Sequence, residues 1–235
     1  FGFFGGGGNR TPSAKAGSHS FTWNMRFPAW TDFEGRIFWA AGPIGPLAVP
    51  GRYQVRMTAG EVVQTRDFEI RMDSRLEGVT IAQLQQRFDL AMQIRDRVTD
   101  ANEAIIEIRE VKAEVDDRLA QTDVRAVEQQ GAVVNTNLGA VEEEVYQVRN
   151  ESSQDPLNFP IKLNNKIASL LGVVESAEGP PTDQSRQVFE DLSGRLQVQL
   201  NRLQVIIETD LRRLNELLES NGLSPIVVRE DRPIP

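Results

Sequence analysis

The stretch DPLNFPIKLNNKIASLLGVVESAEGPPTDQ, residues 155–184, separates two long helical patterns and decides how they fold together. Pro156 and Pro160 interrupt a helix, because proline lacks a backbone donor and restricts the residue before it. An apolar run at helical spacing follows, and a Gly-Pro-Pro sequence ends it. The pattern predicts a short separate helix from about Ile161 to Glu178, with an apolar face of Leu163, Ile167, Leu170, Leu171 and Val174.

Three longer apolar stripes flank this short helix. The first covers residues 81–119 and follows a capping box made by Thr80 and Gln83, so it predicts a helix of about 40 residues and roughly 60 Å. A second stripe, residues 124–148, has coiled-coil spacing and predicts a helix of about 28 residues. The third, residues 189–218, belongs to another helix of about 40 residues that ends at Asn-Gly.

The helix lengths favour one arrangement of the bundle. The second long helix is roughly 18 Å shorter than the other two, and the helix at 161–178 supplies the missing length. We therefore predict an antiparallel bundle of three long legs in which the middle leg is jointed. The alternative is a four-helix bundle in which the short helix turns back beside the others.

The N-terminal third has a different hydrophobic period. FTWNMRF (21–27), YQVRMT (53–58) and DFEIRMD (67–73) alternate apolar and polar residues, which predicts strands with one buried and one solvated face. TAGEVV (58–63) is a turn signal that joins two of these strands as a hairpin. Four or five short strands with Gly/Pro loops indicate an Ig-like antiparallel β-sandwich. Fewer than seven strands are visible, so the sheet is either incomplete or shares strands with sequence elsewhere.

These patterns predict an α+β chain with four parts. Residues 1–17 form a flexible Phe/Gly-rich segment, and residues 18–78 form the Ig-like module. The helical bundle covers 79–222, and 223–235 form a C-terminal tail. The chain begins at Phe1 rather than Met, and we expect it to be a processed or excised C-terminal piece of something longer.

Charge and composition exclude several functions. Residues 1–78 hold nine Lys/Arg and seven Asp/Glu, whereas residues 79–235 hold seventeen and twenty-seven. The acidic helical part disfavours nucleic-acid binding, which needs clustered positive charge. The absence of cysteine excludes disulfides, thiolate metal sites and a cysteine nucleophile. No apolar run approaches the roughly 20 residues that span a bilayer.

Several quoted motifs resemble one protein family. LNFPIKLNNKIASLLG (157–172), together with FTWNMRFP, GPLAVPGRYQVRMT and RFDLAMQIRD, is similar to the C-terminal region of large exported bacterial proteins of the sortilin/VPS10-type BNR-repeat class. The resemblance implies an Ig-like module and a helical tail that follow a β-propeller. No S-x-D-x-G-x-T-W Asp-box occurs in this chain, so the glycoside hydrolase activity often attributed to the family has no matching residues here.

No group of residues predicts a catalytic, cofactor or metal site. His19 is the only histidine, and it has no evident partners for acid–base chemistry or metal binding. Solvent exposure explains the polar run Glu142–Glu144, and capping and solvent exposure explain Asn164 and Asn165. We therefore expect no enzyme activity and no cofactor.

Aromatic residues are the candidate interaction residues. Trp30, Phe33, Phe38 and Trp39 lie in a loop-like region and are either part of the sandwich core or partner-binding residues. Three further aromatics, Phe1, Phe3 and Phe4, adjoin four glycines and are candidates for docking to a partner or a membrane assembly.

The leading functional hypothesis is a non-catalytic structural or interaction subunit. It scaffolds or bridges other proteins, for example as an extrinsic subunit of a respiratory or photosynthetic membrane assembly. We expect it to be bacterial and exported, in the periplasm or at the cell surface, and not transmembrane. The alternatives are an accessory part of a BNR-propeller glycoside hydrolase and a carbohydrate-binding Ig-like module that uses Trp30 and Trp39.

Overall fold

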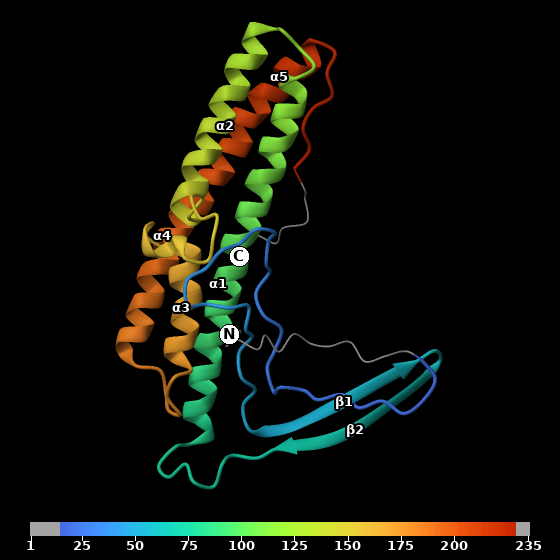
Figure 1. The fold of residues 1–235 in the computed structure, drawn as a ribbon, viewed down its shortest axis with the longest axis vertical. Coiled ribbons are helices and arrows are strands. Elements are labelled where there is room, and N and C mark those ends of the chain that lie inside the picture. The colour runs from blue at the N-terminus through green and yellow to red at the C-terminus, as the bar shows by residue number, and fades with distance from the viewer. Residues whose placement is uncertain (1–14, 229–235) are drawn as a thin grey trace.

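The computed structural model describes residues 15–228 and shows a long helical bundle from which a β-hairpin projects (Figure 1). Helix α1 (Ile81–Leu119) has 39 residues and forms the first leg. The predicted capping box is confirmed, because the Gln83 N–H donates to Thr80 Oγ1 over 3.2 Å and the Thr80 N–H donates to Gln83 Oε1 over 2.9 Å. These two bonds satisfy backbone donors that the first helical turn leaves unpaired.

The remaining helices form the second and third legs. Helix α2 (Arg125–Val145) is followed by a loop that contains the 3-10 turn η1 (Asp155–Leu157) and then by α3 (Leu163–Val174). The last leg consists of α4 (Asp183–Val205), a π-helical segment η2 (Ile206–Leu211) and α5 (Arg212–Ser220), which follow one another without a break. The short helix is therefore confirmed, although it is shorter at both ends than the sequence pattern predicted.

Hydrogen bonds between the legs show that the middle leg is jointed. Asp116 and Arg109 of α1 bond to Asn135 and Glu142 of α2. Farther back along α1, Asn102 and Arg87 bond to Asn164 of α3 and the backbone of Ala177 just after it. Partner numbers rise as α1 numbers fall, so α2 and α3 lie one after the other, antiparallel to α1 (Figure 1). The four-helix alternative, in which the short helix turns back, is therefore wrong.

The predicted apolar stripes form one continuous core between the three legs. Side chains that are fully buried come from every leg: Ile94, Val98, Ile105 and Ile108 of α1, Val134 and Leu138 of α2, Ile167 of α3, and Leu196 and Leu214 of the last leg. Burying one such side chain stabilises the fold by about 1.5–3 kcal/mol. The bundle is therefore a stable platform on which other parts of the chain pack.

The predicted hairpin is confirmed. Strand β1 (Gly51–Ala59) pairs antiparallel with β2 (Val62–Ile70), in a continuous register from Gly51 opposite Ile70 to Ala59 opposite Val62. The turn between them has two residues and begins with Gly60, whose φ is +59°. Glycine adopts this left-handed conformation without the penalty that a side chain would bring.

The predicted Ig-like β-sandwich is not seen. Within residues 15–228 the sheet has two strands, and the only other strand-like pairing is an isolated bridge between Arg26 and Leu47. Residues 26–49, which we call the strap, instead form an irregular extended segment that lies on the bundle (Figure 1). The region predicted as one sandwich module, 18–78, thus divides into a strap that packs on the helices and a hairpin that projects from them.

The period-two pattern at residues 21–27 has a different physical basis from a strand. Trp23 packs against Tyr53 and Phe68 of the hairpin, whereas Phe27 packs against Phe88 of α1. Met25, between them, has a positive φ of +59° and is 47% exposed, and Phe21 is 50% exposed, so the alternating residues do not share one buried face. The pattern here therefore marks neither a strand nor a buried face.

Candidate interaction surface

The strap is fastened to the bundle by a row of buried asparagines. Asn102 and Asn164 are fully buried, and Asn164 Nδ2 donates to Asn102 Oδ1 over 3.2 Å. Asn102 Nδ2 in turn donates to the backbone oxygen of Thr31 over 2.7 Å. Asn165 accepts from the Trp39 N–H over 2.7 Å and donates to the Trp39 carbonyl over 2.9 Å. These bonds satisfy strap backbone groups that have no sheet partner.

Two further side chains hold the strap at its ends and its middle. The carboxylate of Glu175, just beyond α3, accepts from Arg26 Nη1 over 2.7 Å and from the Leu47 N–H over 2.8 Å. The Tyr146 hydroxyl, at the end of α2, accepts from the Ile37 N–H over 3.0 Å and donates to the Gly35 carbonyl over 3.3 Å. The strap is therefore also anchored at the C-terminal ends of α2 and α3.

The sequence prediction missed these polar anchors. Asn164 and Asn165 were expected at the surface, yet only 0% and 3% of their surface is exposed. Glu142, expected on a solvated face, is also buried and pairs with Arg109 and Lys112 over 2.8 and 3.2 Å. One signal was present, because Asn102 interrupts the apolar stripe between Val98 and Ile105. A polar residue in a core stripe requires a buried partner.

The structure separates the predicted aromatic residues. Trp30 is only 4% exposed and belongs to the bundle core, so its side chain is not part of a surface. Phe33 and Phe38 are partly buried against that core, with Arg109 over the Phe33 ring and Arg36 over the Phe38 ring. Trp39 is 41% exposed. Phe1, Phe3 and Phe4 lie outside the described residues.

The hairpin presents an apolar face that the sequence prediction assigned to a sandwich core. On this face Tyr53, Val55, Met57 and Ala59 of β1 lie opposite Phe68, Arg66, Gln64 and Val62 of β2, so the apolar row comes from β1 and two polar residues of β2 lie beside it. Near its base the face is covered, because Trp23 meets the Phe68 ring edge-on at 6.1 Å and lies 5.9 Å from the Tyr53 ring. Farther out, Val55, Met57 and Val62 are each more than half exposed.

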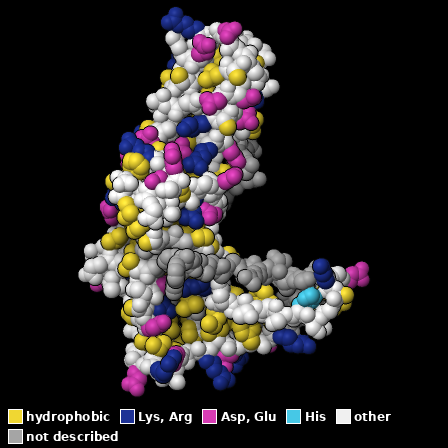
Figure 2. All heavy atoms as spheres, viewed as in Figure 1, with side chains coloured by type: hydrophobic (Ala, Val, Ile, Leu, Met, Phe, Trp, Pro, Cys, Tyr) yellow, Lys and Arg dark blue, Asp and Glu magenta, His cyan; other side chains and the backbone are white. Residues whose placement is uncertain are grey.

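Figure 2 shows charged side chains of both signs over the bundle and along the projecting arm, and hydrophobic side chains gathered at the bundle end where the hairpin begins. Monomeric proteins expose single apolar residues commonly, but a contiguous exposed apolar face marks an interaction site. The distal half of the hairpin's apolar face is therefore the candidate interaction surface.

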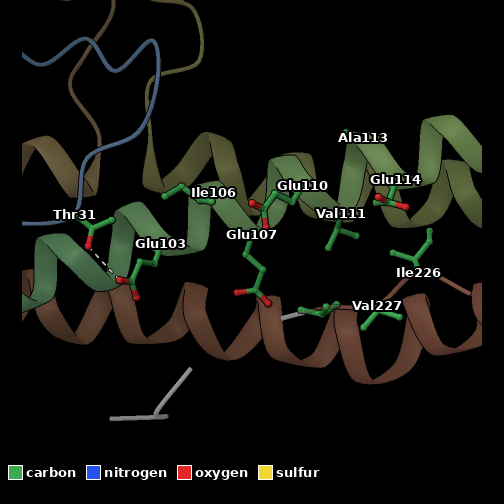
Figure 3. Close-up of a pocket in the computed structure, with 11 residues that line it drawn as sticks. Thr31, Glu103, Ile106, Glu107, Glu110, Val111, Ala113, Glu114, Ile226 and Val227 are labelled. Carbon is green, nitrogen blue, oxygen red and sulfur yellow. Dashed lines mark hydrogen bonds between the residues drawn. The ribbon is translucent and has the colours of Figure 1, made fainter. Parts of the chain in front are cut away.

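A groove of about 730 Å³ lies elsewhere, between α1 and the chain after α5 (Figure 3). Glu103, Glu107, Glu110 and Glu114 line one side, and Ile226 to Val228 line the other. Glu103 accepts from Thr31 and Glu114 pairs with Arg118, while Glu107 and Glu110 also have interaction partners. The groove therefore presents engaged carboxylates and aliphatic side chains.

Metal-binding clusters and membrane-spanning helices are both absent from the part of the chain that the structure describes. In the described part of the chain, no three His, Cys, Asp or Glu side chains are grouped so that they would hold a metal ion. None of the helices between residues 15 and 228 combines the length and apolarity needed to cross a bilayer.

Two carboxyl groups in loops have lowered pKa values. The N–H groups of Glu151 and Ser152 donate to Asp155 and hold the pKa of its carboxyl below the ordinary value, in the loop between α2 and α3. Arg75 does the same for the pKa of Asp73 between the hairpin and α1. Both groups are exposed turn residues, so these shifts reflect turn formation rather than a reactive site.

Comparisons with models of known protein families, with curated proteins and with solved structures gave no match for this chain.

Proposed function

We propose that this protein is a non-catalytic structural subunit that binds a partner protein through its hairpin. The observation that carries the proposal is the exposed apolar face of the hairpin, where Val55, Met57 and Val62 are each more than half exposed. The hydrophobic effect makes such a face unfavourable in water and favourable in an interface. Binding would remove it from water.

The bundle supports this proposal because it is built as a brace. Helix α1 alone is 39 residues long, which corresponds to about 58 Å. The strap and the jointed middle leg pack on it through buried side chains and hydrogen bonds, and the strap leads into β1. The bundle therefore fixes the point from which the hairpin projects.

The sequence resemblance supports the proposed location of the protein, and the architecture supports its proposed place in a membrane assembly. Likeness to exported bacterial proteins supports a location in the periplasm or at the cell surface, and the bracing architecture supports an extrinsic subunit of a larger membrane assembly. The accessory-part alternative uses the same surface, because the partner would then be another domain of the same polypeptide. Reading the gene upstream of Phe1 for Asp-box repeats tests that alternative.

The carbohydrate-binding alternative is not supported by a specific observation. It requires Trp30 and Trp39 to stack together on a sugar, whereas Trp30 lies in the bundle core with 4% of its surface exposed.

The test compares two double variants in the native source. Val55→Lys with Met57→Lys places two charges on the hairpin's apolar face. The matched control, Val188→Lys with Val198→Lys, changes two exposed valines of α4 instead. After gentle purification and mass spectrometry, we expect the first variant to lose a co-migrating protein that the control retains. Identical sets of co-migrating proteins for both variants would contradict the proposal.

A further inference from the structure

The hairpin has open edges as well as an open face. Ala59 and Val62 flank a two-residue turn and so form a hydrogen-bonded pair, and bonded and non-bonded pairs alternate from there along the ladder. Thr58, Arg56, Gln54 and Arg52 therefore direct their backbone N–H and C=O groups away from β2. Within residues 15–228, no backbone hydrogen bond joins these outward groups to another segment.

Apart from two arginines, the outer edge of β1 lacks the features that protect natural edge strands. Its nine residues, GRYQVRMTA, contain neither proline nor lysine, and its register with β2 has no bulge. An unprotected edge of this kind is a template for pairing with another strand. A two-stranded hairpin is also only marginally stable in water, and a third strand beside β1 would stabilise it.

The side chains of this edge indicate what kind of strand it would accept. Arg52 and Arg56 lie on the polar face, and neither makes an ion pair with any residue that the structure describes. Glu69 lies directly opposite Arg52 but pairs with Arg71, and Asp67 accepts from Gln54. Directly opposite charges stabilise neighbouring strands, so the open side of β1 favours acidic neighbours.

We propose that the outer edge of β1 binds an extended strand of a partner protein in which acidic and apolar residues alternate. Acidic side chains of that strand lie beside Arg52 and Arg56 on one face, and its apolar side chains pack beside Val55 and Met57 on the other. Backbone hydrogen bonds to the outward groups of β1 supply the register, as in other cases of strand addition. This inference rests on the proposed function and specifies the partner's chemistry.

A second copy of the chain is a poorer occupant of this edge. Strand β1 contains no acidic residue, so two β1 edges would bring arginines together without counter-charges. Pairing β1 with β2 of a neighbouring copy would join unlike edges, and such contacts do not close into a dimer.

The first experiment measures binding of a synthetic peptide to the full chain by fluorescence anisotropy. The probe has nine residues, matching β1, with valine and glutamate in alternation. The control peptide has lysine in place of glutamate. We expect the acidic probe to bind at least about tenfold more tightly, and the double variant Arg52→Glu with Arg56→Glu to invert that preference. Equal affinities, or no binding at millimolar concentration, would overturn the inference.

A second pair of variants distinguishes the two edges. Thr58→Pro removes an outward N–H from the edge of β1, and Thr65→Pro removes an outward N–H from the edge of β2. Both replacements leave the bonds between β1 and β2 in place, because proline is tolerated where the N–H faces solvent. Loss of peptide binding in the first variant alone supports the inference; equal loss in both, with hairpin amide exchange unchanged, contradicts it.

The outcomes also separate this inference from the proposed function. If Val55→Lys with Met57→Lys releases the native partner but Thr58→Pro does not, the hairpin is a docking element and strand addition at β1 is wrong. If neither variant releases a partner, the proposed function fails as well. Self-association in sedimentation experiments that Thr58→Pro abolishes would show that a second copy occupies the edge, which would also overturn the inference.

Discussion

Gly45 is the residue of the strap with the least surrounding space. A β-carbon there would lie 1.7 Å from the backbone oxygen of Phe27 and 2.6 Å from that of Pro28. Two backbone segments of the strap would have to separate, because neither contact involves a side chain that moves easily. We predict that Gly45→Ala lowers the free energy of unfolding by about 1–3 kcal/mol, measured by urea denaturation.

The matched control is Gly194→Ala in α4. A β-carbon at this position meets no atom within 4 Å, and alanine favours the helix by about 0.5–1 kcal/mol. The two substitutions should therefore change stability in opposite directions. A stabilising effect of Gly45→Ala would show that the strap does not close as described.

Asn102 is the second residue whose role the fold defines closely. It donates to the Thr31 carbonyl and accepts from Asn164, and all of this lies in the bundle interior. We predict that Asn102→Leu destabilises the protein by about 1–3 kcal/mol, because two buried polar groups lose their partner. Asn201→Ala, on the exposed side of α4, is the control and should stay within about 0.5 kcal/mol in the same denaturation measurement.

The helices, whose apolar residues recur at helical spacing, were predictable from the sequence, whereas the strap was not. The capping box at Thr80, the stripe of α1 and the prolines before α3 act locally, so their structural meaning can be read without knowing the fold. Trp23 and Phe27 also alternate with polar residues, but their partners, Phe68 and Phe88, are distant in sequence. Only tertiary contacts decide whether an alternating segment becomes a strand or an extended strap.

The same reasoning explains what was missed at the candidate surface. Alternation in β1 correctly indicated one apolar face, and TAGEVV correctly located the turn. Burial of that face was then assumed, because a sandwich was expected to cover it. The number of strands, and hence the exposure of Val55 and Met57, depends on the rest of the sheet and not on the strand itself.

Trp23, which lies just before the strap in the chain, stabilises the hairpin through its ring contacts. Its ring packs on Tyr53 and Phe68, and aromatic pairs of this kind contribute about 0.5–1.5 kcal/mol each. We predict that Trp23→Ala speeds amide hydrogen exchange throughout β1 and β2 by about tenfold or more while leaving the exchange of α1 unchanged. Trp39→Ala, which removes a partly exposed ring, should leave hairpin exchange as it is. Unchanged hairpin exchange in the Trp23 variant would mean that the hairpin depends on other contacts.

At the scale of the whole molecule, the bundle and the hairpin differ in how they are stabilised. The bundle has a continuous core drawn from all three legs, whereas the hairpin relies on one ladder of hydrogen bonds and a small aromatic cluster. Regions with few buried apolar contacts open more readily than the core of the same protein. A partner that binds the hairpin therefore acts on the least stable element, and its binding energy is used to order that element.

This difference predicts that the bundle folds without the hairpin. Replacing residues 51–70 by a short Gly/Ser linker removes β1 and β2 but no side chain of the bundle core. We expect the melting temperature of the helices, followed by circular dichroism, to stay within about 5 °C of the parent, since a loss of 1 kcal/mol shifts a chain of this size by roughly 2–4 °C. Trp30→Ala is the contrasting variant, because it empties a core position and should cost about 3–5 kcal/mol. If the linker variant instead unfolds as readily as Trp30→Ala, the hairpin is part of what holds the helices together and is not a separate docking element.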